Sequence, residues 1–208
     1  IKITGQLTGG AAANILNKLG GGTLWLANSA NNFTNYIQVD TGFVRAETGG
    51  ALGVGTDAHG LYINGGTFEI RTSAANASTF TTRNVGMYGS GTLFVSNELT
   101  PSGGGIGQTV QFGSLTEYYY GQTLTFSGRD GYGITVGTGA NIALPSTGAQ
   151  TYTNSLNGLL TLNASFSMSD TTARTITFGG NGDTVIKGGF GGTNGPFYWL
   201  KSGSGNLT

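Results

Sequence analysis

The chain has 208 residues, of which 40 are glycine, 31 threonine, 17 asparagine and 15 serine, so four small residue types supply half of it. Charged residues make up only 9% of the chain, nine basic against nine acidic, and the formal net charge is zero. This balance excludes the basic footprint of a nucleic-acid-binding protein, and the 37% of hydrophobic residues is typical of a chain with a buried core rather than a disordered one.

The absence of cysteine excludes a disulfide framework and a zinc–cysteine cluster. It is also typical of bacterial proteins that cross the periplasm unfolded, so we expect an extracellular or cell-surface location. No apolar run approaches the roughly 18 to 20 residues that a membrane-spanning helix needs, and we expect no membrane insertion of this segment.

Short runs with a period of two, separated by Gly, Asn and Ser, dominate the chain and predict β-strands. Helical periodicity is nearly absent, and residues 11–19 are the one stretch compatible with a helix. Turn pairs of the Asn-Gly type are irregularly placed and charges are rare, which favours a stacked solenoid over an antiparallel sandwich. The side chains that we expect to point into its core are Leu24, Leu26, Leu61, Ile63, Phe68, Ile70, Leu93, Val95, Leu160 and Leu162.

A phrase of the form Gly-Thr-apolar-x-apolar recurs at irregular intervals, at residues 22–26, 66–70 and 91–95. The sequence LNKLGGGTLWL at residues 16–26, followed by ANNFT at residues 30–34, resembles the autotransporter-associated β-strand repeat. That family's usual phrase is Leu-x-Lys-x-Gly-x-Gly-Thr-Leu-x-Leu and then Ala-Asn-x-Tyr-Thr, and Phe33 stands here where Tyr is usual. The resemblance implies a right-handed parallel β-helix in the passenger region of a large secreted surface protein.

We therefore expect residues 1–208 to form a single all-β segment, a right-handed parallel β-helix that is a fragment or one repeat of a longer chain. Joined tail to head, residues 205–208 and 1–5 read GNLTIKITG, a strand-like phrase with Leu207, Ile1 and Ile3 on one face. The phrase predicts end-to-end stacking with copies of the chain, either as tandem repeats in one polypeptide, which we favour, or as separate subunits.

Residues with catalytic potential are few and dispersed. His59, the only histidine, lies two positions after Asp57, and a solvated turn is favoured over an acid–base pair because no nucleophile motif accompanies it. The sequence GGNGD at residues 179–183 resembles a calcium-binding nonapeptide, but a single copy with its Asp one position early predicts a glycine-rich corner. The acidic residues are scattered singly: Asp40, Glu47, Asp57, Glu69, Glu98, Glu117, Asp130, Asp170 and Asp183. We expect no catalysis, no metal, no cofactor and no strongly shifted pKa in a large pocket.

The predicted function is a structural or adhesive segment of a large extracellular bacterial surface protein or fibre. The alternative is a carbohydrate-active β-helix enzyme, similar to a polysaccharide lyase or hydrolase. Three or more of the acidic residues would then gather in one groove with Arg71, Arg83, Arg129 or Arg174.

A third hypothesis is a binding module whose contacts are exposed aromatic side chains. If the expected core residues point inward, alternation along each strand places Trp25, Tyr62 and Phe94 outward. Aligned on one face, these three would form an apolar patch for lateral contact with another copy or with another part of the same protein.

Overall fold

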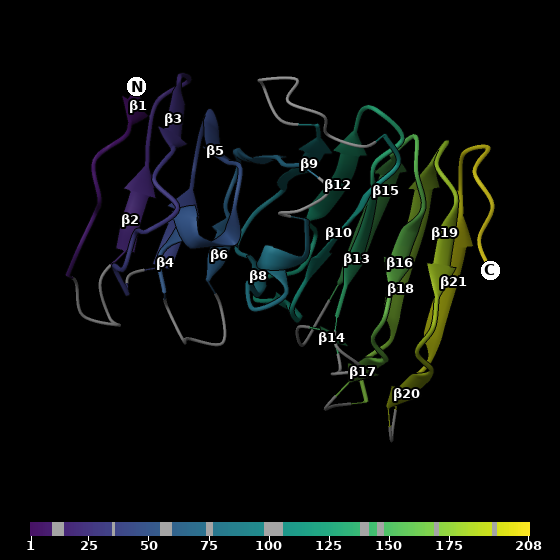
Figure 1. Cartoon of the computed structure of the whole chain (residues 1–208). Coiled ribbons are helices and arrows are strands. Elements are labelled where there is room, and N and C mark those ends of the chain that lie inside the picture. Colours follow the sequence, from purple (N-terminus) through teal and green to yellow (C-terminus); the bar gives the residue numbers. More distant parts are fainter. Residues whose placement is uncertain are drawn as a thin grey trace.

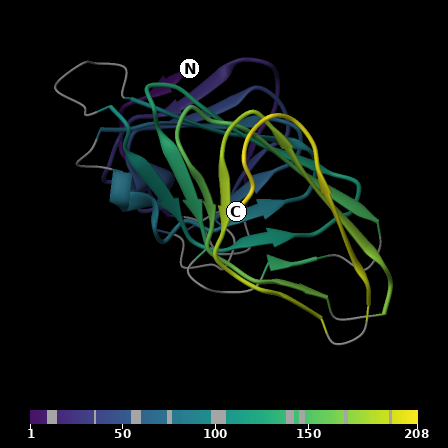
Figure 2. The ribbon, with the colours of Figure 1, turned by 90° about the vertical axis from the view of Figure 1, so that its right-hand side faces the viewer.

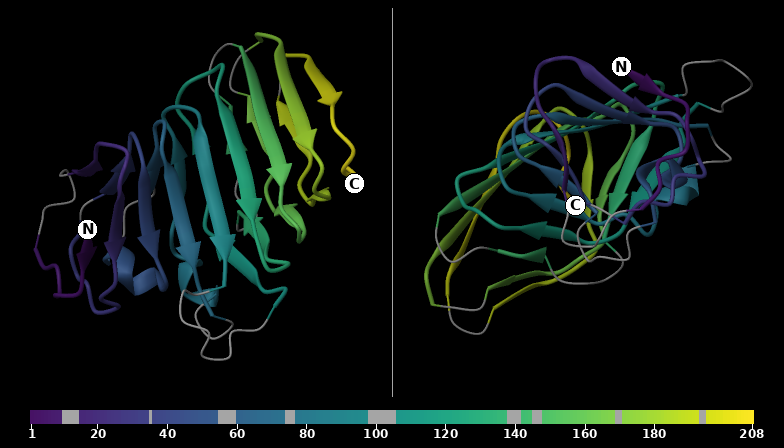
Figure 3. Two further views of the ribbon diagram at one scale, coloured as in Figure 1. Left: turned by 90° about the horizontal axis from the view of Figure 1, so that it is seen from above. Right: turned by 90° about the vertical axis from the view of Figure 1, so that its left-hand side faces the viewer.

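The computed structural model of the chain is a β-solenoid, in which each coil adds parallel strands to sheets that already hold the strands of the preceding coils (Figure 1). It describes residues 1–9, 15–34, 36–54, 60–73, 77–97, 106–137, 142–144, 148–168, 171–192 and 195–208. The coils stack along one axis from the N-terminal end to the C-terminal end (Figures 2 and 3). The predicted all-β parallel solenoid is therefore confirmed.

Sheet A runs the whole length of the described solenoid and holds nine strands in parallel register among the described residues. Its strands, in order, are β1 (Lys2–Ile3), β3 (Thr23–Leu26), β5 (Phe43–Ala46), β7 (Thr67–Arg71), β9 (Gly91–Ser96), β12 (Thr123–Gly128), β15 (Ala149–Ser155), β18 (Arg174–Gly180) and β21 (Phe197–Lys201).

On the other faces of the coil, the N-terminal and C-terminal parts of the solenoid have different sheets. Sheet B serves the N-terminal part and holds β2 (Ile15–Lys18), β4 (Tyr36–Val39), β6 (Leu61–Ile63), β8 (Val85–Met87) and β11 (Leu115–Glu117). Sheet C follows with β10 (Thr109–Phe112), β13 (Gly133–Val136), β16 (Leu160–Leu162) and β19 (Thr184–Ile186), and sheet D with β14 (Ile142–Ala143), β17 (Phe166–Met168) and β20 (Phe190–Gly192). The 3-10 helices η1 (Gly49–Leu52) and η2 (Ala77–Phe80) precede sheet C on its face of the coil, since η2 packs against β10.

The length of a coil varies, which is why the sequence repeat is irregular. Stacked partners in sheet A are 23 residues apart from Lys2 to Trp25 and 20 apart from Trp25 to Arg45. From Phe94 to Ser127 the offset is 33. Strand register is nevertheless kept across this longer coil, because the alternation of apolar residues in β9 and β12 fixes which side chains face the core.

The core follows the alternation that the sequence predicts. Nine of the ten expected core residues are fully buried, and Leu24 is partly buried and packs against them. Towards the C-terminal end the core becomes aromatic: the ring of Tyr152 stacks on Phe126 and on Phe178, which in turn stacks on Trp199, with ring centroids 5.5 to 6.4 Å apart. Each coil thus buries its apolar side chains against those of its neighbours.

The sequence is compatible with a helix over residues 11–19, but this interpretation is wrong for the residues of that stretch that the structure describes. Ile15–Lys18 forms strand β2, which pairs in parallel with β4, and residues 11–14 lie outside the described residues. The reason is that pairing with β4 satisfies the backbone of this segment within sheet B, so the tertiary context overrides a weak local preference.

A substitution at Gly42 tests how closely the corners of neighbouring coils approach each other. Its φ is +70°, and a Cβ atom there would lie 2.5 Å from the carbonyl oxygens of Gly20 and Gly22. We expect Gly42→Ala to lower the free energy of unfolding by about 1–3 kcal/mol. The control Gly21→Ala, where a Cβ meets nothing within 4 Å, should stay within about 0.5 kcal/mol of the parent. Chemical denaturation measures both, and equal losses would show that the corners are not tightly packed.

Candidate functional site

In-register stacking gathers charged and aromatic side chains on the outer face of sheet A. Strand pairing brings Lys2, Trp25, Arg45, Glu69 and Phe94 into one column, one residue from each of the first five strands. Residues that are 20 to 25 positions apart in the sequence therefore become lateral neighbours, at the strand spacing of about 4.8 Å.

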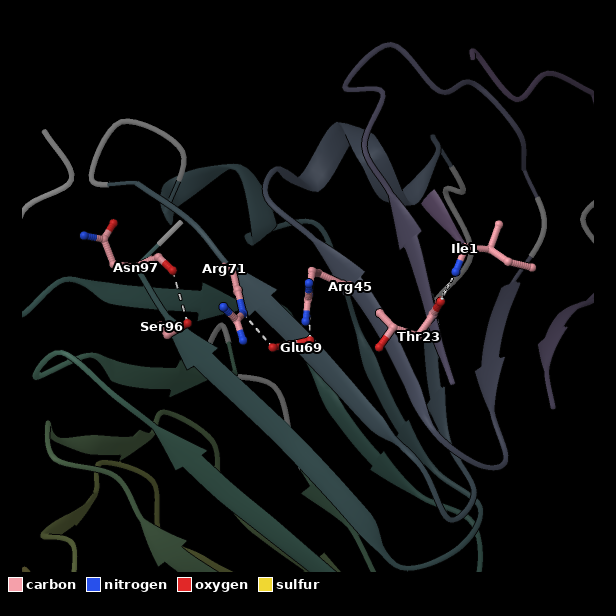
Figure 4. A network of polar contacts seen from close by, with 7 residues as sticks. All are labelled: Ile1, Thr23, Arg45, Glu69, Arg71, Ser96 and Asn97. Atoms are coloured by element: carbon pink, nitrogen blue, oxygen red, sulfur yellow. Dashed lines mark hydrogen bonds and ion pairs between the residues drawn. The ribbon is translucent and has the colours of Figure 1, made fainter. Parts of the chain in front are cut away.

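Glu69 lies at the centre of this column and joins two arginines. Arg45 Nε donates to Glu69 Oε2 at 2.7 Å, and Arg71 Nε donates to Glu69 Oε1 at 2.6 Å. Figure 4 shows the two guanidinium groups on either side of the carboxylate. The Glu69 side chain is 7% exposed, against 19% for Arg45 and 24% for Arg71, so the carboxylate is enclosed while the guanidinium groups keep contact with solvent. Both oxygens of the buried charge have a cationic donor, as burial requires.

The ion-paired residues line a shallow groove of about 350 Å³ on the face of sheet A. Three further kinds of group share it: threonine hydroxyls, aromatic rings and a third arginine. Its lining is Thr23, Phe43, Arg45, Thr67, Glu69, Arg71, Thr92, Phe94 and Arg129. Cations also lie over rings in and beside this groove. The Arg129 guanidinium is 5.9 Å from the centre of the Phe94 ring in the groove, and beside it the Lys2 ammonium is 3.6 Å from the centre of the Trp25 ring. This surface is called the arginine–aromatic groove below.

The three aromatic residues singled out in the sequence do not share one face. Trp25 and Phe94 lie in the outer column of sheet A, whereas Tyr62 belongs to β6 of sheet B. Tyr62 does point away from the core, but it is only 5% exposed because the rings of Tyr36, Tyr88 and Tyr118 pack around it, with centroids 4.8 to 6.0 Å away. The expected three-residue stripe is thus divided between two faces, and the role of its members as partner contacts stays a prediction.

The acidic residues do not gather with the arginines in the described part of the chain. One acidic side chain, Glu69, lines the groove beside Arg71 and Arg129. Arg83 and Arg174 are buried elsewhere: Arg83 donates to the Gly53 carbonyl, and Arg174 Nη1 donates to the Thr172 carbonyl at 2.6 Å. Burial lowers the pKa of Arg83. The residues Asp57, His59, Glu98 and Asp170 lie outside the described residues.

Two other expectations concern metal binding. Within the described ranges, no three His, Asp or Glu side chains come close enough to hold a metal ion. Residues 179–183 form the predicted glycine-rich corner: Gly180 has a φ of +98°, and a Cβ there would meet the Asn154 carbonyl at 2.0 Å. The Asn154 side chain donates to the Asp183 carbonyl at 2.8 Å and so ties this corner to the coil before it.

Glu117 is a buried carboxyl group that the sequence did not reveal. It stacks in register on Met87 in sheet B, and neither of its carboxylate oxygens has a hydrogen-bond partner, although both are fully buried. Burial raises the pKa of this carboxyl to about 8, and the neighbouring Gln150 side chain opposes the shift. Glu117 does not line the arginine–aromatic groove. The shifted pKa therefore comes from desolvation in the core and not from a cluster of ionisable groups.

This carboxyl makes stability depend on pH. The folded state keeps its proton up to about pH 8, whereas the unfolded chain loses it near the ordinary value of 4.5. Stability should therefore be highest at low pH and fall as the pH rises through that window, by at most about 5 kcal/mol. Glu117→Gln should be more stable than the parent above pH 8 and should remove this slope in a series of urea titrations. The matched variant Asp183→Asn changes an exposed carboxylate, and a similar loss of slope in it would contradict the assignment to Glu117.

A comparison with family models, with curated proteins and with solved structures found no match to this chain. The resemblance to the autotransporter-associated repeat therefore stays a prediction. Within the described ranges, the structure has no helix with the length and apolar character needed to cross a bilayer.

Proposed function

We propose that the chain is a structural and adhesive segment of a large extracellular bacterial surface protein, which stacks end to end into a longer β-solenoid. The observation that carries this proposal is the open edge at each end of the described solenoid. Strands β1 and β2 are the first, and β21 and β20 the last, in their sheets. Each of these four has a strand partner on one side, and unpaired edge groups are a template for pairing with another chain. The outer edge of β19, by contrast, is already paired with residues 206–208.

Apolar side chains accompany these open edges. At the N-terminal end Ile1, Ile15 and Leu19 are exposed. At the C-terminal end Phe190 and Trp199 are exposed as well, although both belong to the aromatic stack of the core. A further coil placed on either end would cover these side chains and continue the core, as neighbouring coils do within the chain.

The two halves of the predicted junction lie on different faces of the coil. Leu207 pairs with Thr184 beside sheet C, whereas Lys2 and Ile3 pair with Trp25 and Leu26 in sheet A. Tandem copies joined directly in this geometry would not make the single straight strand that the sequence predicts.

The groove supports binding better than the enzymatic alternative. Glycoside hydrolysis uses two carboxyl groups on either side of the scissile bond, and Glu69 is the single acidic side chain among the described residues that line the groove. Both of its oxygens already accept an arginine N–H. The extracellular location is part of the proposal, and the absence of cysteine and the repeat-like phrase at residues 16–34 support it.

Self-association of the purified chain tests the stacking proposal. We expect association that strengthens with concentration in sedimentation velocity, and we expect Ile15→Lys combined with Leu19→Lys to weaken it at least tenfold, because charges on an edge disfavour strand pairing. Both side chains are exposed, so the fold should be kept. Leu159→Lys adds charge at an exposed site directly before β16, a strand that has neighbours on both sides in sheet C, and should have no effect. A chain that sediments as a monomer at every concentration would contradict the proposal.

A further inference from the structure

The arginine–aromatic groove concentrates positive charge on a chain whose net charge is zero. Four of the nine basic residues, Lys2, Arg45, Arg71 and Arg129, lie on or beside it. Within the described ranges, a single carboxylate, that of Glu69, faces them in the groove. The carboxylate of Asp130, next to Arg129 in sequence, binds the backbone instead: its Oδ2 accepts the Asn97 backbone N–H at 3.1 Å. The surface therefore favours an anionic ligand.

The arginines keep hydrogen-bonding capacity for such a ligand. Arg45 and Arg71 each contact Glu69 through Nε, and their terminal guanidinium nitrogens make no hydrogen bond within the described part of the chain. Arg129 is exposed and has no ion-pair partner there either. A planar guanidinium group with free N–H donors is the side chain best suited to a carboxylate, which it can bind through two parallel hydrogen bonds. Glu69 holds two of these guanidinium groups in place without using up their donors.

The remaining lining suits sugar rings. Phe43 and Phe94 offer apolar ring faces, and Thr23, Thr67 and Thr92 offer hydroxyl groups that both donate and accept. A pyranose has the complementary surface, with C–H groups on its faces and hydroxyl groups at its rim. From Trp25 to Phe94 the column spans three strand spacings, about 14 Å, which is room for a short run of sugar units rather than a single one.

Other anionic polymers fit this surface less well. A peptide that adds as a strand needs a free sheet edge, but the groove lies over β3, β5, β7 and β9, which all have hydrogen-bonded neighbours on both sides. A nucleic acid requires many phosphate contacts spread over a basic surface, and this chain has a net charge of zero.

We propose that the arginine–aromatic groove binds an acidic polysaccharide, with its carboxylate groups on Arg45, Arg71 and Arg129 and its sugar rings against Phe43 and Phe94. The assignment rests on the adhesive role proposed above and gives that role a ligand class. Binding is non-covalent and should weaken as salt is raised, because the partly exposed arginines are screened.

Calorimetric titration of the full chain with polygalacturonate oligomers tests the proposal. We expect binding to polygalacturonate but not to dextran, a neutral glucan, or to polyglutamate, an acidic polypeptide. Arg129→Gln and Phe43→Ala should each weaken binding by about tenfold, the effect of losing one charged hydrogen-bonding group or one ring contact. Lys187→Gln removes the same charge from an exposed site outside the groove and should leave the affinity unchanged.

Three results would overturn the proposal: no heat of binding with polygalacturonate, equal binding of polyglutamate, or an equal loss of affinity in Lys187→Gln. Thermal unfolding of each variant establishes that it is folded before its affinity is compared. The titrations use chain concentrations at which sedimentation shows monomer. If the chain self-associates but does not bind polygalacturonate, the proposal of an acidic polysaccharide ligand is refuted and the stacking proposal stands. If it binds polygalacturonate but does not self-associate, only the stacking proposal is refuted.

Discussion

Every coil of this protein depends on backbone hydrogen bonds and apolar contacts that only the neighbouring coils can supply. In the part of the chain that the structure describes, no strand pairs with the strand that follows it in sequence; β3, for example, pairs with β1 and β5. Register between coils is therefore the constraint on which the core, the corners and the outer surface all depend. It also explains the composition, because glycine at a corner such as Gly42 avoids a clash with the carbonyl oxygens of the coil before it.

The same constraint governs where charge can be placed. A parallel in-register stack sets each side chain against the one a coil away, so like charges in one column would repel. The outer column of sheet A avoids this with the order Lys2, Trp25, Arg45, Glu69 and Phe94, in which rings and one carboxylate separate the cations. Charged residues are rare in the sequence, but this arrangement brings several of them into one groove. There Glu69 holds the guanidinium groups of Arg45 and Arg71 in place, and both groups are partly shielded from solvent.

The fold could be predicted from the sequence because it depends on local alternation. The runs at residues 61–63 and 93–95 place their apolar side chains in the core as expected. The groove could not be predicted in the same way, because the contact between Arg45 and Glu69 depends on a 24-residue offset that differs from the 20 residues of the preceding coil. Glu117 was missed for a related reason: its burial depends on stacking over Met87, and no local pattern marks it. For residues 15–18, weak helical character yielded to pairing with β4.

Cross-linking across neighbouring coils tests the claim of in-register stacking most directly, since the chain has no cysteine of its own. Thr67 and Thr92 are paired residues on adjacent strands, whereas Thr125 is the partner of Thr92 one coil further on. The Cα atoms of the first pair should be about 5 Å apart, within disulfide reach, and Thr67 and Thr125 about 10 Å apart, beyond it. Oxidation of the double variant Thr67→Cys and Thr92→Cys should give an intramolecular disulfide, detected by mass spectrometry of the digested chain. The double variant Thr67→Cys and Thr125→Cys should give none. Equal cross-linking of the two variants, or cross-linking of the second alone, would contradict the register on which this structure depends.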